Sequence, residues 1–332
     1  MKSYVVTRYG KDGASLSDIP QPELRDDDVL VQVHASGVNP LDAKIRDGDF
    51  KLLLRYRLPF ALGNEAAGVV LRVGPAVRRF QPGDEVYARP GKDRIGTFAE
   101  CIAISEACVA AKPKTLTMQE AASVPLVALT AWQALFDRAK VQRGQRVLIH
   151  AGSGGVGTMA IQLAKHAGAI VATTTSTANV ELLKSLGADV VIDYKKEDFE
   201  TRVEGCDMVL NSLDATTLMK SVSVLKPGGH LVSISGPPDP AFAKEVGMNW
   251  GLRQVMSLMS LRIRRRAAQR RVHYSFLFMK ASGDQLREIG ALIDAGAIRP
   301  VVDRVFPFER TADALAYVET GRAKGKVVVA MR

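Results

Sequence analysis

The stretch that decides the fold is His150–Gly157, which reads HAGSGGVG. It carries the pattern Gly-x-Gly-x-x-Gly at Gly152, Gly154 and Gly157. The pattern alone is weak evidence, because glycine occurs at many sharp turns, so the flanking residues matter. The apolar run 147–149 before it is typical of a buried parallel strand, and residues 158–168 after it have apolar side chains at helical spacing. With a second apolar strand at 169–175, the segment predicts a βαβ unit that binds a dinucleotide.

Each glycine of the pattern has a distinct expected role in such a unit. Gly152 allows the tight turn, Gly154 lets a pyrophosphate approach the backbone, and Gly157 lets the helix pack closely on the strand. The N–H groups at the start of the helix and its partial positive charge attract phosphate. The alternative is a structural turn without a ligand, but the surrounding strands and helix favour the dinucleotide site.

The end of the second strand distinguishes the two nicotinamide dinucleotides. An NAD site usually has an Asp or Glu there, about 20 residues after the glycines, to bind the ribose 2′-hydroxyl. Residues 173–179 instead read TTTSTAN, which are hydroxyl and amide groups with no carboxylate to repel a 2′-phosphate. Ser176 or Thr177 could also serve as the N-cap of the next helix, and both roles are compatible. The sequence therefore favours NADPH over NADH.

Composition and cysteine usage indicate a globular enzyme of the cytoplasm. The chain has 332 residues, of which 47% are hydrophobic and 24% charged, enough for two domains with their own cores. We expect no signal peptide and no membrane span, because no apolar run is long enough. The three cysteines, Cys101, Cys108 and Cys206, are scattered, which fits a reducing compartment and excludes a cysteine-based zinc site.

The net charge of +10 is concentrated in one segment. Residues Arg262–Arg271, RIRRRAAQRR, hold six arginines and follow an apolar helical segment, 249–261. Few aromatic residues lie nearby for base stacking, so we expect no nucleic-acid partner. The simplest interpretation is a solvated helix end, or a rim that holds an anionic group of a ligand. Contact with an anionic membrane surface is the remaining alternative.

The chain changes character twice along its length. The first ~120 residues form short strands with regular turns, such as the alternating strand 28–38, and indicate a barrel or sandwich. A helical segment opens with a capping box at Thr117 and Glu120 and is interrupted at Pro125. From Val147 onward strands and helices alternate, which predicts a right-handed, doubly wound parallel sheet. The tail after about Leu277 is expected to fold back onto the N-terminal part.

Seven landmarks together resemble the medium-chain dehydrogenase/reductase superfamily, and within it the zinc-independent quinone oxidoreductase branch. They are GVNPLDAKIRDG, LGNEAAGVVLRVG, FQPGDEVYA, AASVPLVALTAWQAL, AGSGGVGTMAIQLAKHAGA, SLGADVVIDY and GRAKGKVVV. The resemblance runs nearly end to end. It implies an α/β protein with a GroES-like, β-rich catalytic domain at 1–122, a Rossmann NADP-binding domain at 123–270 and a return segment at 271–332 that completes the catalytic domain. It also implies a homodimer.

The zinc ligands of related alcohol dehydrogenases are replaced in this chain. The zinc-dependent members have a Cys and a His at positions where this sequence has Asn39 and Asn64, and the four-cysteine structural lobe is missing. Amides are poor zinc ligands, and Glu65 alone does not make a site, so we expect no metal. Without a Lewis acid, the expected acceptor is one that takes hydride easily, a quinone or the alkene of an α,β-unsaturated carbonyl.

The resemblance also implies which residues bind the cofactor. The implied contacts are Asn39, Thr130, Gly152, Ser153, Gly154, Gly155, Val156, Gly157, Thr175, Ser176, Asn179, Tyr194, Ser235, Gly236, Phe278 and Lys326. Asn39 could instead be a turn residue before a proline, and Tyr194 could simply cover the end of the sheet. Phe278 and Lys326 could be packing residues. Asp42 is a candidate for substrate contact or for a local ion pair.

One departure leaves the proton donor open. Many relatives have a Tyr where this chain has Phe50, which cannot donate a proton, and Tyr56 could supply a phenol instead. The catalytic candidates are therefore Asn39, Asp42 and Tyr56. The leading hypothesis is NADPH-dependent hydride transfer to a quinone or another conjugated carbonyl.

Two alternatives to that hypothesis stay open. One is a 2-alkenal or enoyl-thioester reductase that uses Tyr56 as the acid, in which the arginines bind a coenzyme A phosphate. The other is a non-catalytic NADPH-binding protein that docks nucleic acid or an anionic membrane through Arg262–Arg271.

Overall fold

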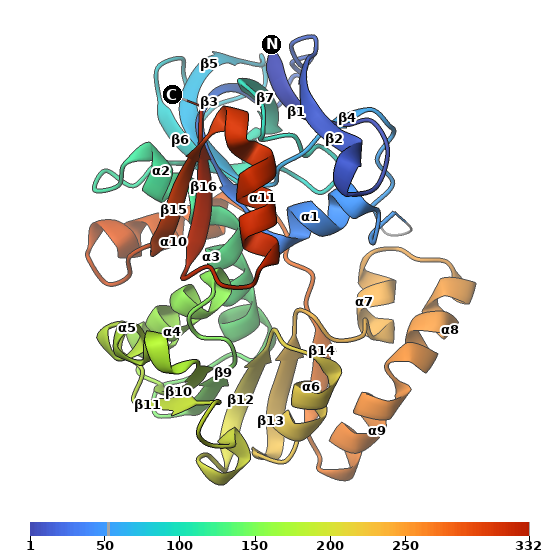
Figure 1. The fold of residues 1–332 in the computed structure, drawn as a ribbon, viewed down its shortest axis with the longest axis vertical. Helices are drawn as coiled ribbons and strands as arrows, with labels where there is room; N and C mark the ends of the chain where they lie inside the picture. Colours follow the sequence, from blue (N-terminus) through green and yellow to red (C-terminus); the bar gives the residue numbers. More distant parts are fainter. Residues whose placement is uncertain (52–53, 332) are drawn as a thin grey trace. The chain divides into compact units, whose positions relative to one another are not determined.

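The computed structural model describes residues 1–51 and 54–331, whose contacts divide the chain into two units (Figure 1). The first unit is Met1–Leu129 with Lys280–Arg332, and the second is Thr130–Met279. Both ends of the chain thus build one unit. The sequence places residues 123–129 in the Rossmann domain and residues 271–279 in the return segment. By their contacts, residues 123–129 belong to the first unit and residues 271–279 to the second.

The first unit is built on a seven-stranded sheet. Its strand order is β15 (Val302–Pro307), β16 (Lys326–Ala330), β3 (Asp28–Val38), β5 (Ala66–Val73), β6 (Glu85–Ala88) and β8 (Val109–Ala111), with β7 (Cys101–Ser105) also paired to β3. The C-terminal strand β16 pairs antiparallel with β3, so the end of the chain adds a strand to this sheet. A second sheet joins β1 (Lys2–Val6), β2 (Ala14–Asp18) and β4 (Phe60–Ala61).

Strand β3 is buried on both faces at its start. Val29, Val31 and Val33 pack in one cluster, whereas Leu30 packs with Cys101 in another. The alternation of the sequence predicts a half-buried strand, which is correct only for the part that contains Gln32 and His34. On the second face Leu30 packs with Cys101 and Ala103 of β7, which lie far away in the sequence and cannot be seen in the local pattern of β3.

Among the described residues, five helices border this unit. They are α1 (Pro40–Asp47), α2 (Met118–Ala122), α3 (Pro125–Trp132), α10 (Gly283–Asp294) and α11 (Thr311–Glu319). Thr117 caps α2 in a capping box with Glu120, and the helical segment breaks before Pro125, both as the sequence predicts. Helix α3 contains the boundary between the units.

The second unit is a doubly wound parallel sheet. The strand order is β11 (Val190–Asp193), β10 (Ile170–Thr175), β9 (Arg146–Ile149), β12 (Cys206–Asn211), β13 (Leu225–Ser233) and β14 (His273–Phe276). Helices α4 (Gly155–His166), α5 (Val180–Ser185), α6 (Ala215–Ser221), α7 (Pro240–Glu245), α8 (Trp250–Met259) and α9 (Leu261–Gln269) connect the strands. The order reverses between β9 and β12, where such sheets bind ligands at the strands' carboxyl ends. The predicted fold class is therefore confirmed.

Strand β14 lies in a different sheet from the one expected. The sequence places it in the return segment, but it pairs in parallel with β13, with His273 opposite His230. Parallel pairing satisfies its backbone groups at the edge of the Rossmann sheet, and the chain leaves for the first unit only after this strand.

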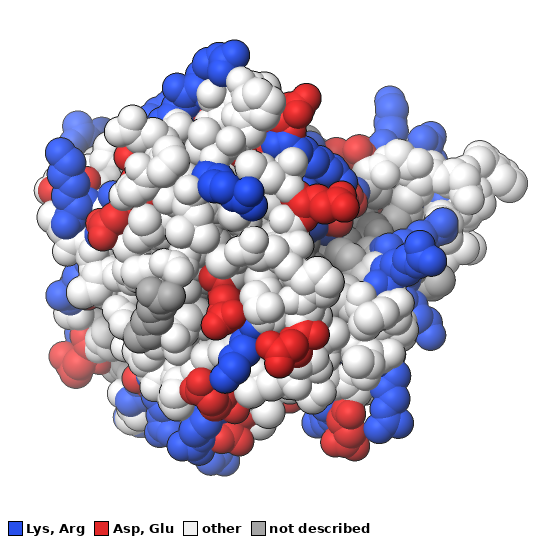
Figure 2. Space-filling model, turned by 90° about the horizontal axis from the view of Figure 1, so that it is seen from above, with Lys and Arg blue, Asp and Glu red and all other residues white. Residues whose placement is uncertain are grey.

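Two further observations concern membranes and charge. Among the described residues, none of the helices is both long and apolar enough to cross a bilayer. On the face drawn in Figure 2, lysine and arginine side chains are interspersed with acidic ones, so this face carries no continuous basic surface.

Candidate active site

The glycine turn between β9 and α4 is tightly constrained at two of its three glycines. A Cβ atom on Gly152 would lie 2.0 Å from Thr173 Oγ1, and one on Gly157 would lie 2.5 Å from the carbonyl oxygen of Ala151. A Cβ on Gly154 would meet only that same carbonyl oxygen among the described atoms, at 3.4 Å, an ordinary contact. Packing therefore requires Gly152 and Gly157, whereas Gly154 faces open space that a ligand can occupy.

The N-terminus of α4 is open to an anion. Gly154 is its N-cap residue, and no described side chain accepts a hydrogen bond from the first turn. By contrast, Ser282 caps α10 by accepting from the N–H of Gln285. The first N–H groups of a helix need an external acceptor and lie at its positive end. Gly155, Val156 and Gly157 therefore offer N–H groups that suit a pyrophosphate.

A cluster of hydroxyl and amide groups lies beside this turn. The Ser153 hydroxyl accepts hydrogen bonds from Thr175 Oγ1 at 3.2 Å and from Asn179 Nδ2 at 3.1 Å. Asn179 Nδ2 also donates to Ser176 Oγ at 3.3 Å. The buried Asn179 Oδ1 has no hydrogen-bond partner among the described residues. It is a free acceptor of the kind that a ribose hydroxyl would satisfy, so the residues present fit a dinucleotide.

A carboxylate that the sequence analysis missed lies one strand further. Asp193 ends β11 directly opposite Thr175 and accepts a hydrogen bond from Thr177 Oγ1 at 2.6 Å. This bond, with one from the N–H of Lys195, keeps the pKa of Asp193 below its usual value. A carboxylate directly after the apolar residues of β11 was the feature of the sequence that could have predicted this residue. Tyr194, which follows, is 62% exposed, so its ring does not cover the sheet.

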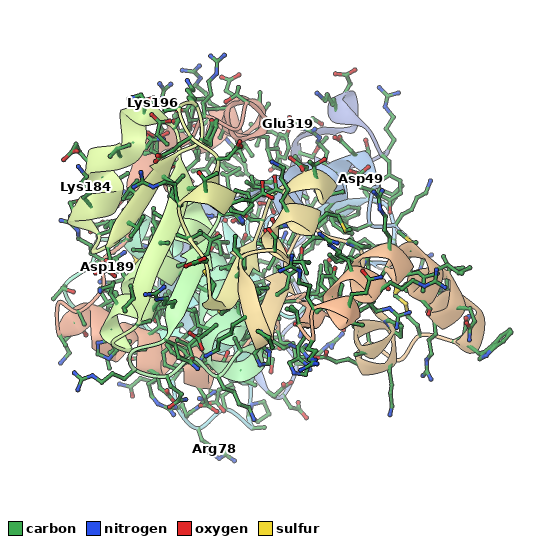
Figure 3. All side chains as sticks on the ribbon, turned by 90° about the horizontal axis from the view of Figure 1, so that it is seen from below. Asp49, Arg78, Lys184, Asp189, Lys196 and Glu319 are labelled. Carbon is green, nitrogen blue, oxygen red and sulfur yellow. The ribbon has the colours of Figure 1, made fainter. Side chains whose placement is uncertain are left out.

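Two lysines near this edge each have an acidic neighbour. Lys184 on α5 pairs with Glu181 at 2.8 Å, and Lys196 lies 3.6 Å from Asp193. Figure 3 shows Lys184 and Lys196 at the same edge of the second unit. Both are exposed, so solvent screens these pairs and leaves the ammonium groups able to exchange partners.

The remaining predicted cofactor contacts of the second unit lie directly after β13 or near the first and last residues of the unit. Ser235 donates to the carbonyl of Leu213, and the Gly236 N–H donates to Ser233 Oγ at 2.7 Å. Thr130 is buried in α3, and the ring of Phe278 lies 6.1 Å from that of Phe242.

In the first unit, Asn39 and Asp42 form the start of α1. The Asn39 N–H donates to Asp42 Oδ2 at 2.7 Å, and Asn64 Nδ2 donates to Asp42 Oδ1 at 2.7 Å. Asp42 has no exposed surface, and burial raises its pKa to about 6, against the lowering effect of these two bonds. Asp42 is therefore a capping residue and a carboxyl group that titrates near neutral pH.

The buried ammonium group of Lys326 binds the side chain of Asn39. Lys326 Nζ donates to Glu65 Oε1 at 2.6 Å, to Asn39 Oδ1 and to the carbonyl of Val38 at 3.2 Å. Asn39 Nδ2 donates to Glu65 Oε1 at 2.8 Å, and Glu65 Oε2 accepts from the N–H of Leu126 at 2.7 Å. The amide of Asn39 is thus bonded on both sides, and Lys326 forms a buried ion pair.

Tyr56 and Arg89 lie within electrostatic range of this cluster. Tyr56 donates its phenolic proton to the carbonyl of Lys92 at 2.7 Å, and burial raises its pKa. Arg89 is 2% exposed, and burial lowers its pKa. Its Nε, and the Oδ1 of Asn64, have no hydrogen-bond partner among the described residues. Arg89 was not among the residues predicted from the sequence, although it directly follows the apolar strand β6.

Comparison with known proteins places the chain in a family. Residues 25–118 match the family model "Alcohol dehydrogenase GroES-like domain", and residues 186–329 match "Zinc-binding dehydrogenase". The chain is 37% identical over 341 residues to a 2-methylene-furan-3-one reductase of Solanum lycopersicum, across 99% of this chain and 79% of that protein. The chain belongs to the medium-chain dehydrogenase/reductase superfamily.

Two other members of the superfamily identify the branch to which the chain is similar. A chloroplastic NADPH-dependent alkenal/one oxidoreductase of Arabidopsis thaliana is 38% identical, across 99% of this chain and 79% of the relative. The solved structure of the quinone oxidoreductase from Coxiella burnetii is 32% identical, with a TM-score of 0.87 over 100% of this chain and 99% of that chain. The resemblance to the quinone oxidoreductase branch is confirmed, and this medium-chain reductase is an enzyme rather than a non-catalytic binding protein.

Proposed function

We propose that this medium-chain reductase transfers hydride from NADPH to quinones and other conjugated carbonyl compounds without zinc. The main support for a reaction without zinc is the buried ammonium group of Lys326, which donates hydrogen bonds to Glu65 and Asn39. A fixed cation already satisfies the oxygens that a metal would need. No three His, Cys, Asp or Glu side chains in residues 1–51 and 54–331 lie together as ligands. Amides and one carboxylate are a poor donor set for zinc.

NADPH, when bound, supplies the hydride, and the protein supplies its binding and orientation. We assign the pyrophosphate to the open N-terminus of α4, residues 153–157, and the 2′-phosphate to the hydroxyl and amide groups of Thr175, Ser176 and Asn179. Tyr194 follows the carboxyl end of β11, and Ser235 and Gly236 follow that of β13, at the edge of the sheet where this fold class binds nucleotides. They remain proposed contacts, as do Thr130 and Phe278.

The choice of acceptor follows from the charge that hydride addition creates. When hydride adds to the β-carbon of an enone or to a quinone, the electron pair moves to oxygen and an enolate or hydroquinone anion forms. This anion is stabilised by conjugation and takes one proton from water or a nearby acid, so no Lewis acid is needed. Relatives named as a quinone oxidoreductase and an alkenal/one oxidoreductase use acceptors of this class.

The experiment that tests this function compares both cofactors with both acceptors. The purified protein is given NADPH or NADH with an ortho-quinone, a simple enal or a saturated aldehyde. We expect rapid loss of NADPH absorbance with the quinone or the enal, at least about tenfold slower loss of NADH, and none with the aldehyde. Prior dialysis against a chelator should not change these rates. Equal use of NADH, or loss of activity on chelation, would overturn the assignment.

Tyr56 is not expected to act as the acid. Its proton is donated to a backbone carbonyl, and burial raises its pKa, which makes it a weaker acid. We predict that Tyr56→Phe keeps both quinone and enal turnover within about twofold of the wild type, whereas loss of a true general acid typically costs about 10²–10⁴-fold. Steady-state rates with the two acceptors decide this. A selective loss of enal turnover would restore the enal-reductase alternative with Tyr56 as the donor.

We also propose a homodimer in the cytoplasm. The free state of Cys101, Cys108 and Cys206 fits a reducing compartment, and the dimer is usual for the branch. Sedimentation of the purified protein and fractionation of cells test the two points separately.

A further inference from the structure

The outward face of α8 is apolar. The exposed residues of this helix are Trp250, Gly251, Gln254, Val255, Leu258 and Met259, none of them charged. The exposed fraction is 76% for Trp250, 70% for Leu258, 58% for Met259 and 51% for Val255. Single exposed apolar residues are ordinary, but a group of four large ones on one helix marks an interaction surface.

Helix α9 follows directly and carries an unpaired positive charge. Arg262, Arg265, Arg266, Arg270 and Arg271 are exposed, whereas Ile263 and Ala267 anchor the opposite face of the segment in the core of the second unit. None of these arginines forms an ion pair with a carboxylate among the described residues, although Arg138 of the same unit pairs with Glu245. The charge is therefore available to an external anion.

The apolar and basic side chains meet in one hollow of the surface. It is lined by Met219 of α6 with Leu258, Leu261, Arg262, Arg265, Arg266 and Gln269. No acidic residue lines it. In Figure 1 α9 lies beside β14 and α8 extends away from the sheet, and the tip at the right edge of Figure 2, where α8 lies in Figure 1, is white with no acidic residue.

We propose that α8 and α9 form a docking surface for an anionic lipid bilayer. Helices that lie in the plane of a membrane have an apolar face, which enters the boundary between headgroups and acyl chains, and basic residues that bind lipid phosphates. Trp250, Val255 and Leu258 supply the first feature, and the exposed arginines of α9 supply the second.

Two other occupants fit this surface less well. A nucleic acid would pair with the arginines but would leave the uncharged face of α8 in water. A second copy of the chain, docked through the same surface, would bring two sets of arginines together with no carboxylate between them. Docking is independent of the reductase activity, which serves below as a measure of correct folding.

The experiment is binding to vesicles, followed by sedimentation and by the fluorescence of Trp250. A Trp132→Phe background leaves Trp250 as the one tryptophan, because the chain has two. Equimolar phosphatidylcholine and phosphatidylglycerol vesicles should bind the protein and shift its emission to shorter wavelength. Pure phosphatidylcholine vesicles should bind at least about tenfold more weakly, and raising the salt should weaken anionic binding by a similar factor.

Two variants and a matched control test the residues. R262Q/R265Q/R266Q should lower binding to anionic vesicles at least about tenfold, and V255Q/L258Q should remove the emission shift. The control K114Q/K140Q/R322Q removes the same charge from exposed positions elsewhere and should keep binding within about twofold. Quinone turnover should be unchanged in all three.

Three outcomes would overturn the proposal. They are no binding to anionic vesicles by an active protein, equal losses in the arginine variant and its control, and binding to random double-stranded DNA but not to vesicles.

Discussion

Burial in the first unit disfavours the charged form of Asp42. Burial raises its pKa from 3.8 to about 6, so the folded protein holds this proton more tightly than the unfolded chain. The resulting stabilisation is fully present below about pH 4 and is lost as the pH rises through about 6. The shift corresponds to about 3 kcal/mol of unfolding free energy.

We predict that Asp42→Asn removes this pH dependence. Relative to the variant, the wild type should lose up to about 3 kcal/mol of unfolding free energy between pH 4 and pH 7, measured by urea denaturation at each pH. Asp49→Asn, an exposed aspartate just after α1, serves as the control and should keep the wild-type slope. If Asp42→Asn also kept that slope, Asp42 would titrate normally in the folded protein.

Gly154, the N-cap of α4, and Gly157, in its first turn, should respond differently to alanine. Gly154→Ala places its Cβ in open space, so we predict an unchanged melting temperature without cofactor but at least about tenfold weaker NADPH binding. Gly157→Ala drives its Cβ against the backbone of Ala151 and should cost about 1–3 kcal/mol of stability. Thermal unfolding and fluorescence titration with NADPH separate these effects. Normal NADPH binding by Gly154→Ala would show that no pyrophosphate approaches this turn.

At the scale of elements, the end of β10 should determine which cofactor binds. A carboxylate at Ser176 would repel the 2′-phosphate of NADPH and accept a hydrogen bond from the 2′-hydroxyl of NADH. We predict that Ser176→Asp weakens NADPH binding at least about tenfold and leaves NADH binding equal or tighter. Ser185→Asp adds the same charge at the end of α5 and is the control. Equal effects of the two variants on NADPH affinity would indicate a long-range charge effect only.

Helices and strands whose apolar residues follow a regular spacing could be predicted from the sequence. The apolar run of β9, the glycines and the helical spacing of α4 define that unit without tertiary information. Strand β14 could not be assigned, because a four-residue strand does not encode which sheet it joins. The start of β3 was expected to expose one face, but Leu30 is buried there against Cys101 and Ala103, which are distant in the sequence.

The candidate sites show the same limit. Ser153, Thr175, Ser176 and Asn179 were predicted together, because parallel strands bring their carboxyl ends to one edge. The ion pair of Glu65 with Lys326 joins residues 261 positions apart, so its geometry depends on the whole fold.

At the scale of the whole molecule, that ion pair links the two ends of the chain within the first unit. Lys326 stands on β16, and its partner Glu65 directly precedes β5, with β3 between these strands. Lys326→Met would leave a buried carboxylate without its cation, so we predict a loss of about 3–5 kcal/mol of unfolding free energy. Adding Glu65→Gln should restore part of it. A cost below about 1 kcal/mol for the single variant would mean that the pair is not buried in solution.

In the proposed reaction, hydride goes to the conjugated carbon of the acceptor and not to a carbonyl carbon. The most direct measurement uses NADPH deuterated at nicotinamide C4, an α,β-unsaturated ketone as acceptor, and NMR of the product. We predict a saturated ketone with one deuterium at the former β-carbon. Deuterium on the carbonyl carbon of an allylic alcohol would contradict it, because the protein would then be a carbonyl reductase.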